Sequence, residues 1–113
     1  GGKLMEKLIS ERKITGVLDI TLMELTCEYL GGILTAGPER LEQAGLTGTP
    51  QVVSLGGLDI ISLGPFDDVA EKFPQRNLYR HNDQITAMRT TPEECRKMAV
   101  IVAEKLNRAK GLC

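Results

Sequence analysis

Two side chains in this sequence could carry out proton chemistry, Asp19 and His81. Asp19 follows a short apolar run, where a carboxylate could bind a sugar hydroxyl or a metal-bound water, or accept a proton. His81 is the single histidine and could act as a general acid or base near neutral pH. These two residues are the candidate catalytic groups. The alternatives are an aspartate that caps the next helix and a histidine that lies in a polar loop.

The glycines at the start of the sequence and a polar segment near residue 90 are candidate anion-binding elements. Gly1 and Gly2 precede a helical pattern, and the N–H groups at a helix N-terminus bind anions. The alternative is that they only end a turn or are an expression scar. Arg89 and Thr90 precede the last helix, where a guanidinium and hydroxyls could clamp an anion. Thr21 begins a capping-box pattern. The candidate ligand-binding residues are Gly1, Gly2, Asp19, Thr21, Arg89 and Thr90.

We expect the polar residues at predicted strand ends to converge on one cleft. Such positions gather at one edge of a parallel sheet even when they are far apart in sequence. A cleft formed by Gly2, Asp19, His81 and Arg89 would suit a small molecule that bears a phosphate or a carboxylate. In the competing interpretation, Asp19 and Arg89 form a structural salt bridge and His81 points to solvent.

The cysteines, the charge and the hydropathy exclude several classes of function. Cys27, Cys95 and Cys113 lack CxxC spacing, so neither a disulfide framework nor a zinc site is expected, and no metal is predicted. Reduced thiols suit a cytoplasmic protein. The formal net charge of −1 gives no attraction to nucleic acid or to an anionic membrane. No apolar run approaches the ~18 residues of a membrane span.

Helical and strand patterns alternate along the chain and must position these residues. We expect a helix over 3–13, a strand over 16–20, a helix that Thr21 and Glu24 cap and that runs to Leu30, and a strand over 51–55. Residues 66–76, which have mixed polarity and contain Pro74, are expected to form an excursion over the surface. The last helix is the best defined, with Thr91 as its cap and Pro92 at its first position. Cys95 lies on the predicted buried stripe of this helix.

This alternation predicts an α/β fold with a mainly parallel sheet and helices on both faces. Strands 17–19 and 52–54 should lie parallel in that sheet. The 113 residues are interpreted as a single α/β domain, and as an excerpt of a longer two-domain chain, because no strand precedes the first helix. The remainder of its own chain is therefore an expected partner.

Several strings in the sequence resemble a known family over nearly the whole chain. They include the stretches at 16–21, 36–38 and 80–82, the run Met88-Arg89-Thr90-Thr91-Pro92-Glu93-Glu94, and Ala103-Glu104-Lys105-Leu106-Asn107. These strings are similar to the C-terminal α/β domain in the family of the tomato mosaic virus resistance protein. That family is described as ATP-binding and has no established reaction. Its usual Thr-Gly-x-Gly-Gly turn is represented here only by Gly1 and Gly2.

The resemblance implies a Rossmann-like fold, a homodimer and ATP as a possible cofactor. The function expected from it is a ligand-binding α/β domain that binds a nucleotide or another phosphate- or carboxylate-bearing small molecule. The alternatives are an enzyme acting on a small carbonyl or acyl substrate, through Asp19, His81 and Arg89, and a structural dimerisation module.

Overall fold

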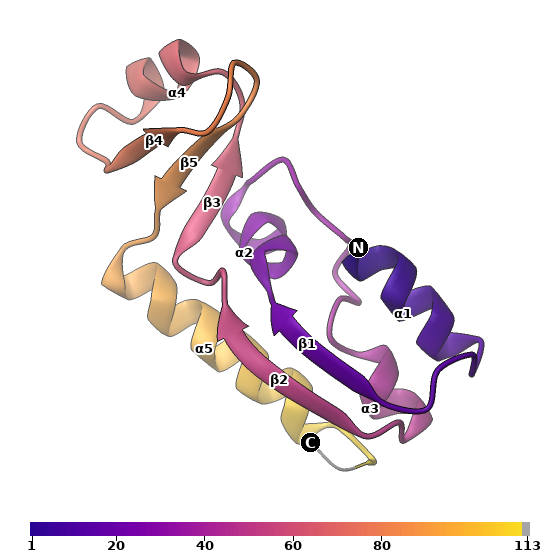
Figure 1. Cartoon of the computed structure of the whole chain (residues 1–113). Helices are drawn as coiled ribbons and strands as arrows, with labels where there is room; N and C mark the ends of the chain where they lie inside the picture. Colours follow the sequence, from indigo (N-terminus) through magenta and orange to yellow (C-terminus); the bar gives the residue numbers. More distant parts are fainter. Residues whose placement is uncertain (112–113) are drawn as a thin grey trace.

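The computed structural model describes residues 1–111, which form an α/β chain with two separate small sheets (Figure 1). The first sheet pairs β1 (Val17–Thr21) with β2 (Gln51–Gly56) in parallel, as predicted. The second sheet has the order β3-β5-β4 and is antiparallel throughout. Its strands are β3 (Ile60–Leu63), β4 (Leu78–Arg80) and β5 (Thr86–Arg89). The mainly parallel sheet expected from the sequence is therefore wrong, and a Rossmann-like arrangement is not confirmed.

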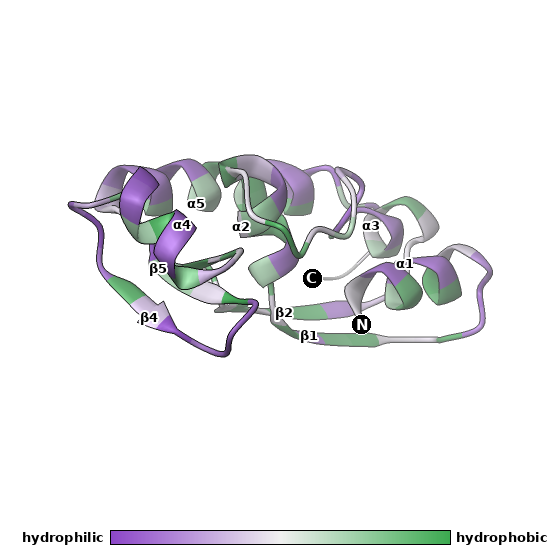
Figure 2. Cartoon of the chain, turned by 90° about the horizontal axis from the view of Figure 1, so that it is seen from above, coloured by the Kyte–Doolittle hydropathy of each residue, from purple (hydrophilic) through white to green (hydrophobic). Residues whose placement is uncertain are grey.

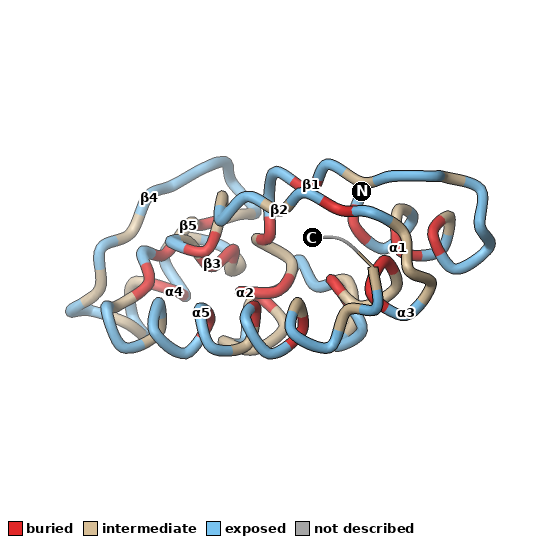
Figure 3. Tube along the Cα trace, turned by 90° about the horizontal axis from the view of Figure 1, so that it is seen from below, coloured by how far each residue is buried: buried red, intermediate tan, exposed pale blue. Residues whose placement is uncertain are grey.

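The helices that accompany the parallel pair lie on one side of it. They are α1 (Gly2–Ser10), α2 (Met23–Leu30), α3 (Gln43–Thr47) and α5 (Pro92–Asn107). Views from above and from below place all four on the same side of β1 and β2 (Figures 2 and 3). The expectation of helices on both faces is thus wrong for the described residues.

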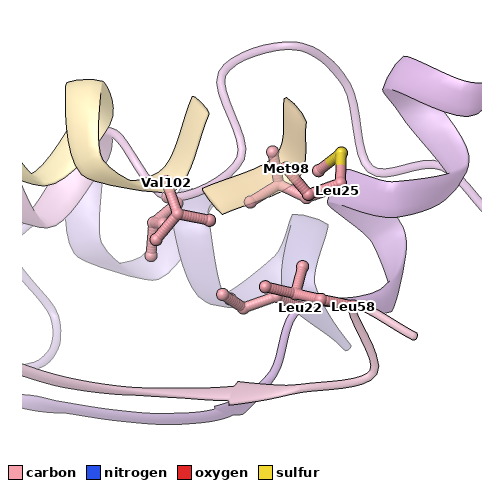
Figure 4. Packing of buried hydrophobic residues seen from close by; sticks show 6 residues of the cluster. Leu22, Leu25, Leu58, Met98 and Val102 are labelled. Atoms are coloured by element: carbon pink, nitrogen blue, oxygen red, sulfur yellow. The ribbon is translucent and has the colours of Figure 1, made fainter. Parts of the chain in front are cut away.

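The hydrophobic core lies between the parallel pair and helices α2 and α5. Its buried residues come from α2, α5, the segments that follow β1 and β2, and the segment before α3 (Figure 4). A second cluster joins α2 to the antiparallel sheet through Cys27, Ile61 and Met88. The larger cluster comprises Leu22, Leu25, Leu41, Leu58, Met98 and Val102.

Local signals account for some helix boundaries and fail at others. Thr91 and Glu94 form the predicted capping box, with Pro92 in the first turn of α5. The second predicted box is absent, because α2 begins after Leu22 and has no side-chain cap. The segment expected to form a surface excursion contains helix α4 (Phe66–Lys72), which was not predicted.

The sequence predicted free cysteine thiols, with Cys95 on the buried side of its helix, and no membrane-spanning helix. Cys27 is buried and Cys95 is exposed, and both are free thiols, whereas Cys113 lies outside the described residues. The expected buried position of Cys95 is wrong. No helix in residues 1–111 is long and apolar enough to cross a membrane.

Candidate functional site

A buried arginine, Arg40, holds the polar residues at the carboxyl end of β1 together. Its side chain is 1% exposed, and its Nη1 and Nη2 donate to the two carboxylate oxygens of Asp19, at 2.5 and 2.7 Å. Such a two-point contact fixes both side chains. Nη2 also donates to the carbonyl oxygen of Thr21 at 3.3 Å. Asp19 is itself 5% exposed, so solvent screens this pair weakly.

Glu6 of α1 is the second carboxylate of the cluster and fixes the segment that carries Arg40. One oxygen of Glu6 accepts from Arg40 Nη1 at 3.2 Å and from the N–H of Leu41 at 2.6 Å. The other oxygen accepts from the N–H of Gln43 at 3.1 Å. Leu41 has a φ of 73°, which is unusual for any residue other than glycine. The bond to Glu6 and the burial of the Leu41 side chain hold this backbone in place.

Glu24 of α2 completes the cluster and binds the start of α1. Its Oε1 accepts from the N–H of Gly2 at 3.1 Å, and its Oε2 lies 3.8 Å from Nε of Arg40. That Nε has no hydrogen-bond partner among the described residues. Burial alone would lower the pKa of Arg40, but Asp19, followed by Glu24 and Glu6, raises the pKa above its ordinary value. Arg40 therefore stays charged against three carboxylates.

A second buried cation fixes the other end of this segment. Lys105 of α5 donates to the carbonyl oxygen of Pro38 at 2.6 Å and to Glu42 at 2.7 Å. The Lys105 side chain is 2% exposed and that of Glu42 is 29% exposed, so the ammonium group is buried and the carboxylate is partly open to solvent. The segment that carries Arg40 is thus tied to α1 by Glu6 and to α5 by Lys105.

An open groove of about 260 Å³ lies between α1 and residues 36–43, beside the buried cluster. Lys3, Lys7 and Ser10 line it from α1, and Gln43 lines it from the opposite side, where Glu39 adds a carboxylate. Lys3 and Lys7 are four residues apart, so they lie on one side of the helix. Lys7 is 3.8 Å from Glu11 in an exposed ion pair, which solvent weakens. We call this feature the α1 groove.

Two of the predicted residues, Gly2 and Asp19, do lie near each other, joined through Glu24 and Arg40. The N–H of Gly2 is bonded to Glu24, so an internal carboxylate occupies the donor predicted for a ligand. Both oxygens of Asp19 are bonded to Arg40, and a carboxylate paired in this way is a weaker general base. Gly1 is the N-cap residue of α1. Gly1 and Thr21 are both exposed.

The remaining predicted residues lie on the antiparallel sheet or beside it, with partners of their own. His81 is exposed in the turn between β4 and β5. Arg89 is 3.4 Å from Asp59 in an exposed pair, so the alternative of a bridge to Asp19 is wrong. Thr90 is buried, and its hydroxyl donates to the carbonyl oxygen of Leu58 at 3.2 Å. The contacts of Asp19, His81 and Arg89 give no support to a common cleft.

No pattern in the sequence assigns a role to Glu6 or to Arg40. Nothing local marks either residue, because their partners lie 16 to 37 positions away along the chain. The usable signal was the amphipathic pattern of α1. Glu6 and Ile9 are three residues apart and share its buried side.

No group of three or more histidine, cysteine, aspartate or glutamate side chains suited to a metal ion occurs within residues 1–111. The oxygens of Glu6 and Asp19 are instead directed at the guanidinium of Arg40 and at backbone N–H groups.

Known proteins are similar to this chain along nearly its whole length. Residues 1–113 match the C-terminal domain of uncharacterised protein family UPF0261. A UPF0261 protein of Clostridium tetani is 52% identical over 110 residues, which is 97% of this chain and 27% of that protein. The UPF0261 protein RA0729 of Rhizobium meliloti is 41% identical over 98% of this chain and 28% of its own length.

A plant protein is also similar. The ToMV resistance protein Tm-1(GCR237) of Solanum lycopersicum is 39% identical over 98% of this chain and 15% of its own length. The chain thus spans about a quarter of the bacterial relatives and less of the tomato protein. Because the match covers every residue, the chain belongs to the UPF0261 C-terminal domain family.

Proposed function

We propose that this chain is a ligand-binding α/β domain that binds a small molecule bearing a phosphate or a carboxylate in the α1 groove. The observation that carries the proposal is the groove itself, where Lys3 and Lys7 lie side by side on α1. Two ammonium groups at this spacing can bind one anionic group between them.

The groove has a rigid side on which a ligand can rest. Glu6 and Arg40 line it and are both buried, and their mutual bonds leave them little freedom to move. A pre-organised site loses less entropy when it binds a ligand. Ser10 and Gln43 offer neutral hydrogen bonds to the rest of the ligand, and Glu39 suits a ligand hydroxyl or amine.

Nucleotides are one class within this proposal, and ATP is the first probe because of the family resemblance. The groove volume of about 260 Å³ suits a phosphate-bearing portion rather than a whole nucleotide. The rest of such a ligand would extend beyond this domain. Binding by the whole protein is therefore the property to test.

The test is isothermal titration calorimetry on the full-length protein with ATP, inorganic phosphate and succinate. We expect at least one of these probes to bind. The double variant Lys3→Ala/Lys7→Ala should weaken that binding about tenfold or more, because one charge-assisted bond contributes roughly 1.5 kcal/mol or more. Added salt should weaken the wild-type affinity as well.

The matched control removes two cations from α5, in the variant Arg96→Ala/Lys97→Ala. Both side chains lie on an exposed part of that helix, and neither lines the groove. This control makes the same change in net charge and should leave the affinity within about twofold of wild type. Unchanged affinity in the Lys3/Lys7 variant, or an equal loss in both variants, would contradict the groove as the site.

A further inference from the structure

One face of the parallel pair β1–β2 is apolar and has nothing packed against it among the described residues. Leu18, Ile20 and Val52 are 66%, 59% and 64% exposed. Leu18 and Val52 are partners in the strand register, so their side chains are neighbours on one face. We call these three side chains the bare face. Figures 2 and 3 show that the helices lie on the opposite side.

Side chains alternate between the two faces of β1, so the bare face lies opposite the face that the helices cover. Asp19 lies between Leu18 and Ile20 and points to the helical side, where it meets Arg40. Leu55 is also 64% exposed and lies beside the register shift between the two strands. Ser54, two residues after Val52, adds an exposed hydroxyl but no charge to this side, whose composition is closer to that of a buried core than to that of a surface.

The outer edge of β1 is also open. The N–H groups of Val17 and Leu22 donate to Pro50 and Gly56 on the side of β2, at 2.9 and 2.7 Å. Within residues 1–111, β1 has no second strand as a neighbour. Parallel sheets are normally covered on both faces, and an open apolar edge invites pairing with another strand.

We propose that another part of the same longer polypeptide packs on the bare face and adds a strand to the open edge of β1. The bacterial relatives are long enough to supply it, since the matched region is only 27% and 28% of their lengths. An uncharged apolar surface also suits a permanent contact, of the kind found inside one folded chain, better than a transient one.

The position of α1 indicates where the added strand belongs. α1 lies on the same side of the sheet as α2 and α3, which connect β1 to β2 (Figure 2). Crossovers between parallel strands are right-handed in nearly all proteins. If successive helical connections lie on the same side of the sheet, each new strand is added at the same edge, so the strands lie side by side in chain order. A strand that leads into α1 therefore lies beside β1, on the side away from β2.

The test measures cysteine labelling in the full-length protein with Cys95 replaced by serine, resolved by peptide mass spectrometry. Leu18→Cys and Val52→Cys probe the bare face from two strands, so one variant serves if the other folds poorly. Val100→Cys on α5 is the matched control, since Val100 is 56% exposed and lies on the helical side. We expect both probes to react at least tenfold more slowly than the control at every protein concentration.

Equal labelling of the probes and the control would overturn the proposal, because the face would then be open to solvent. Protection that disappears on dilution would overturn it too, since a second copy of the chain would be the covering partner. A companion readout is amide exchange at Leu18 and Ile20, whose N–H groups face the open edge. These amides should exchange as slowly as those of Val17 and Asp19, which face β2.

Discussion

Arg40 gives the polar residues around β1 their structural role. Its bonds to Asp19 and Glu6 are nearly buried, whereas Arg89 pairs with Asp59 at the surface. Buried pairs and surface pairs differ strongly in what they contribute when one partner is removed. The two pairs therefore allow a direct comparison within one protein.

The first prediction concerns the charge of Asp19. Asp19→Asn leaves the guanidinium of Arg40 buried without its main partner, so we expect the free energy of unfolding to fall by about 3 kcal/mol. Chemical denaturation of the full-length protein measures this change. The control is Asp59→Asn, which should cost at most about 1 kcal/mol because that carboxylate is 53% exposed. Similar losses in the two variants would refute the buried-pair interpretation.

The second prediction concerns Gly2, which was expected to allow a ligand close to the backbone. A Cβ at this position would lie 2.5 Å from Nε of Arg40 and 2.6 Å from Oε1 of Glu24. Because Arg40 is fully packed, Gly2→Ala should lower the free energy of unfolding by roughly 1–3 kcal/mol. The control is Gly64→Ala, where nothing lies within 4 Å of the added atom. Thermal unfolding of the two variants would show whether close packing explains the glycine.

Capping patterns in the sequence predicted a helix start correctly where the contacts are local, and failed where contacts with distant residues determine the structure. The α5 capping box is local, since the side chains of Thr91 and Glu94 each accept from the other residue's backbone N–H, and it was predicted correctly. The pattern at Thr21 and Glu24 is similar, but Glu24 bonds to Gly2, 22 positions away. A single sequence holds no sign of that competition.

The antiparallel pairing of the second sheet could not be predicted, for a related reason. β4 and β5 have only three and four residues, which is too short for a clear alternation of apolar and polar side chains. Their pairing with β3 depends on contacts between distant segments. By contrast, β2 was predicted because Val52, Val53 and Leu55 form a longer apolar run.

The third prediction uses pH and the α5 cap. Burial alone would raise the pKa of Glu94, but the bonds from Arg76 and Thr91 outweigh it and lower that pKa below the ordinary 4.5. A carboxyl group with a lowered pKa in the folded state stabilises the fold above the unfolded pKa. This contribution is lost as the pH falls through the folded pKa.

We therefore expect Glu94→Gln to be less stable than wild type by about 1 kcal/mol near pH 7. The difference should shrink as the pH falls from the ordinary value of 4.5 through the lowered pKa of the folded state, because Glu94 then becomes protonated in the folded state as well. Denaturation at several pH values measures it. Glu93→Gln is the control, since Glu93 is 78% exposed and should change stability little. A stability gap that does not vary with pH would argue against the charge as its cause.

At the scale of the whole molecule, the described residues form an elongated structure with one bare sheet face. Its principal extents are 44, 26 and 18 Å, and its core is concentrated between the parallel pair and α2 and α5. The α1 groove lies near one end of the long axis, and the antiparallel sheet with His81 lies toward the other (Figure 1). These two regions are the competing locations for a ligand.

Hydrogen–deuterium exchange on the full-length protein, with and without saturating ATP or inorganic phosphate, distinguishes them most directly. We expect slower exchange in residues 3–10 and 36–43 when a probe binds, because these segments form the two sides of the α1 groove. Residues 78–89, which include His81 and Arg89, should exchange at the same rate in both conditions. Protection confined to residues 78–89, or no protection of the groove by any probe that binds, would contradict the account.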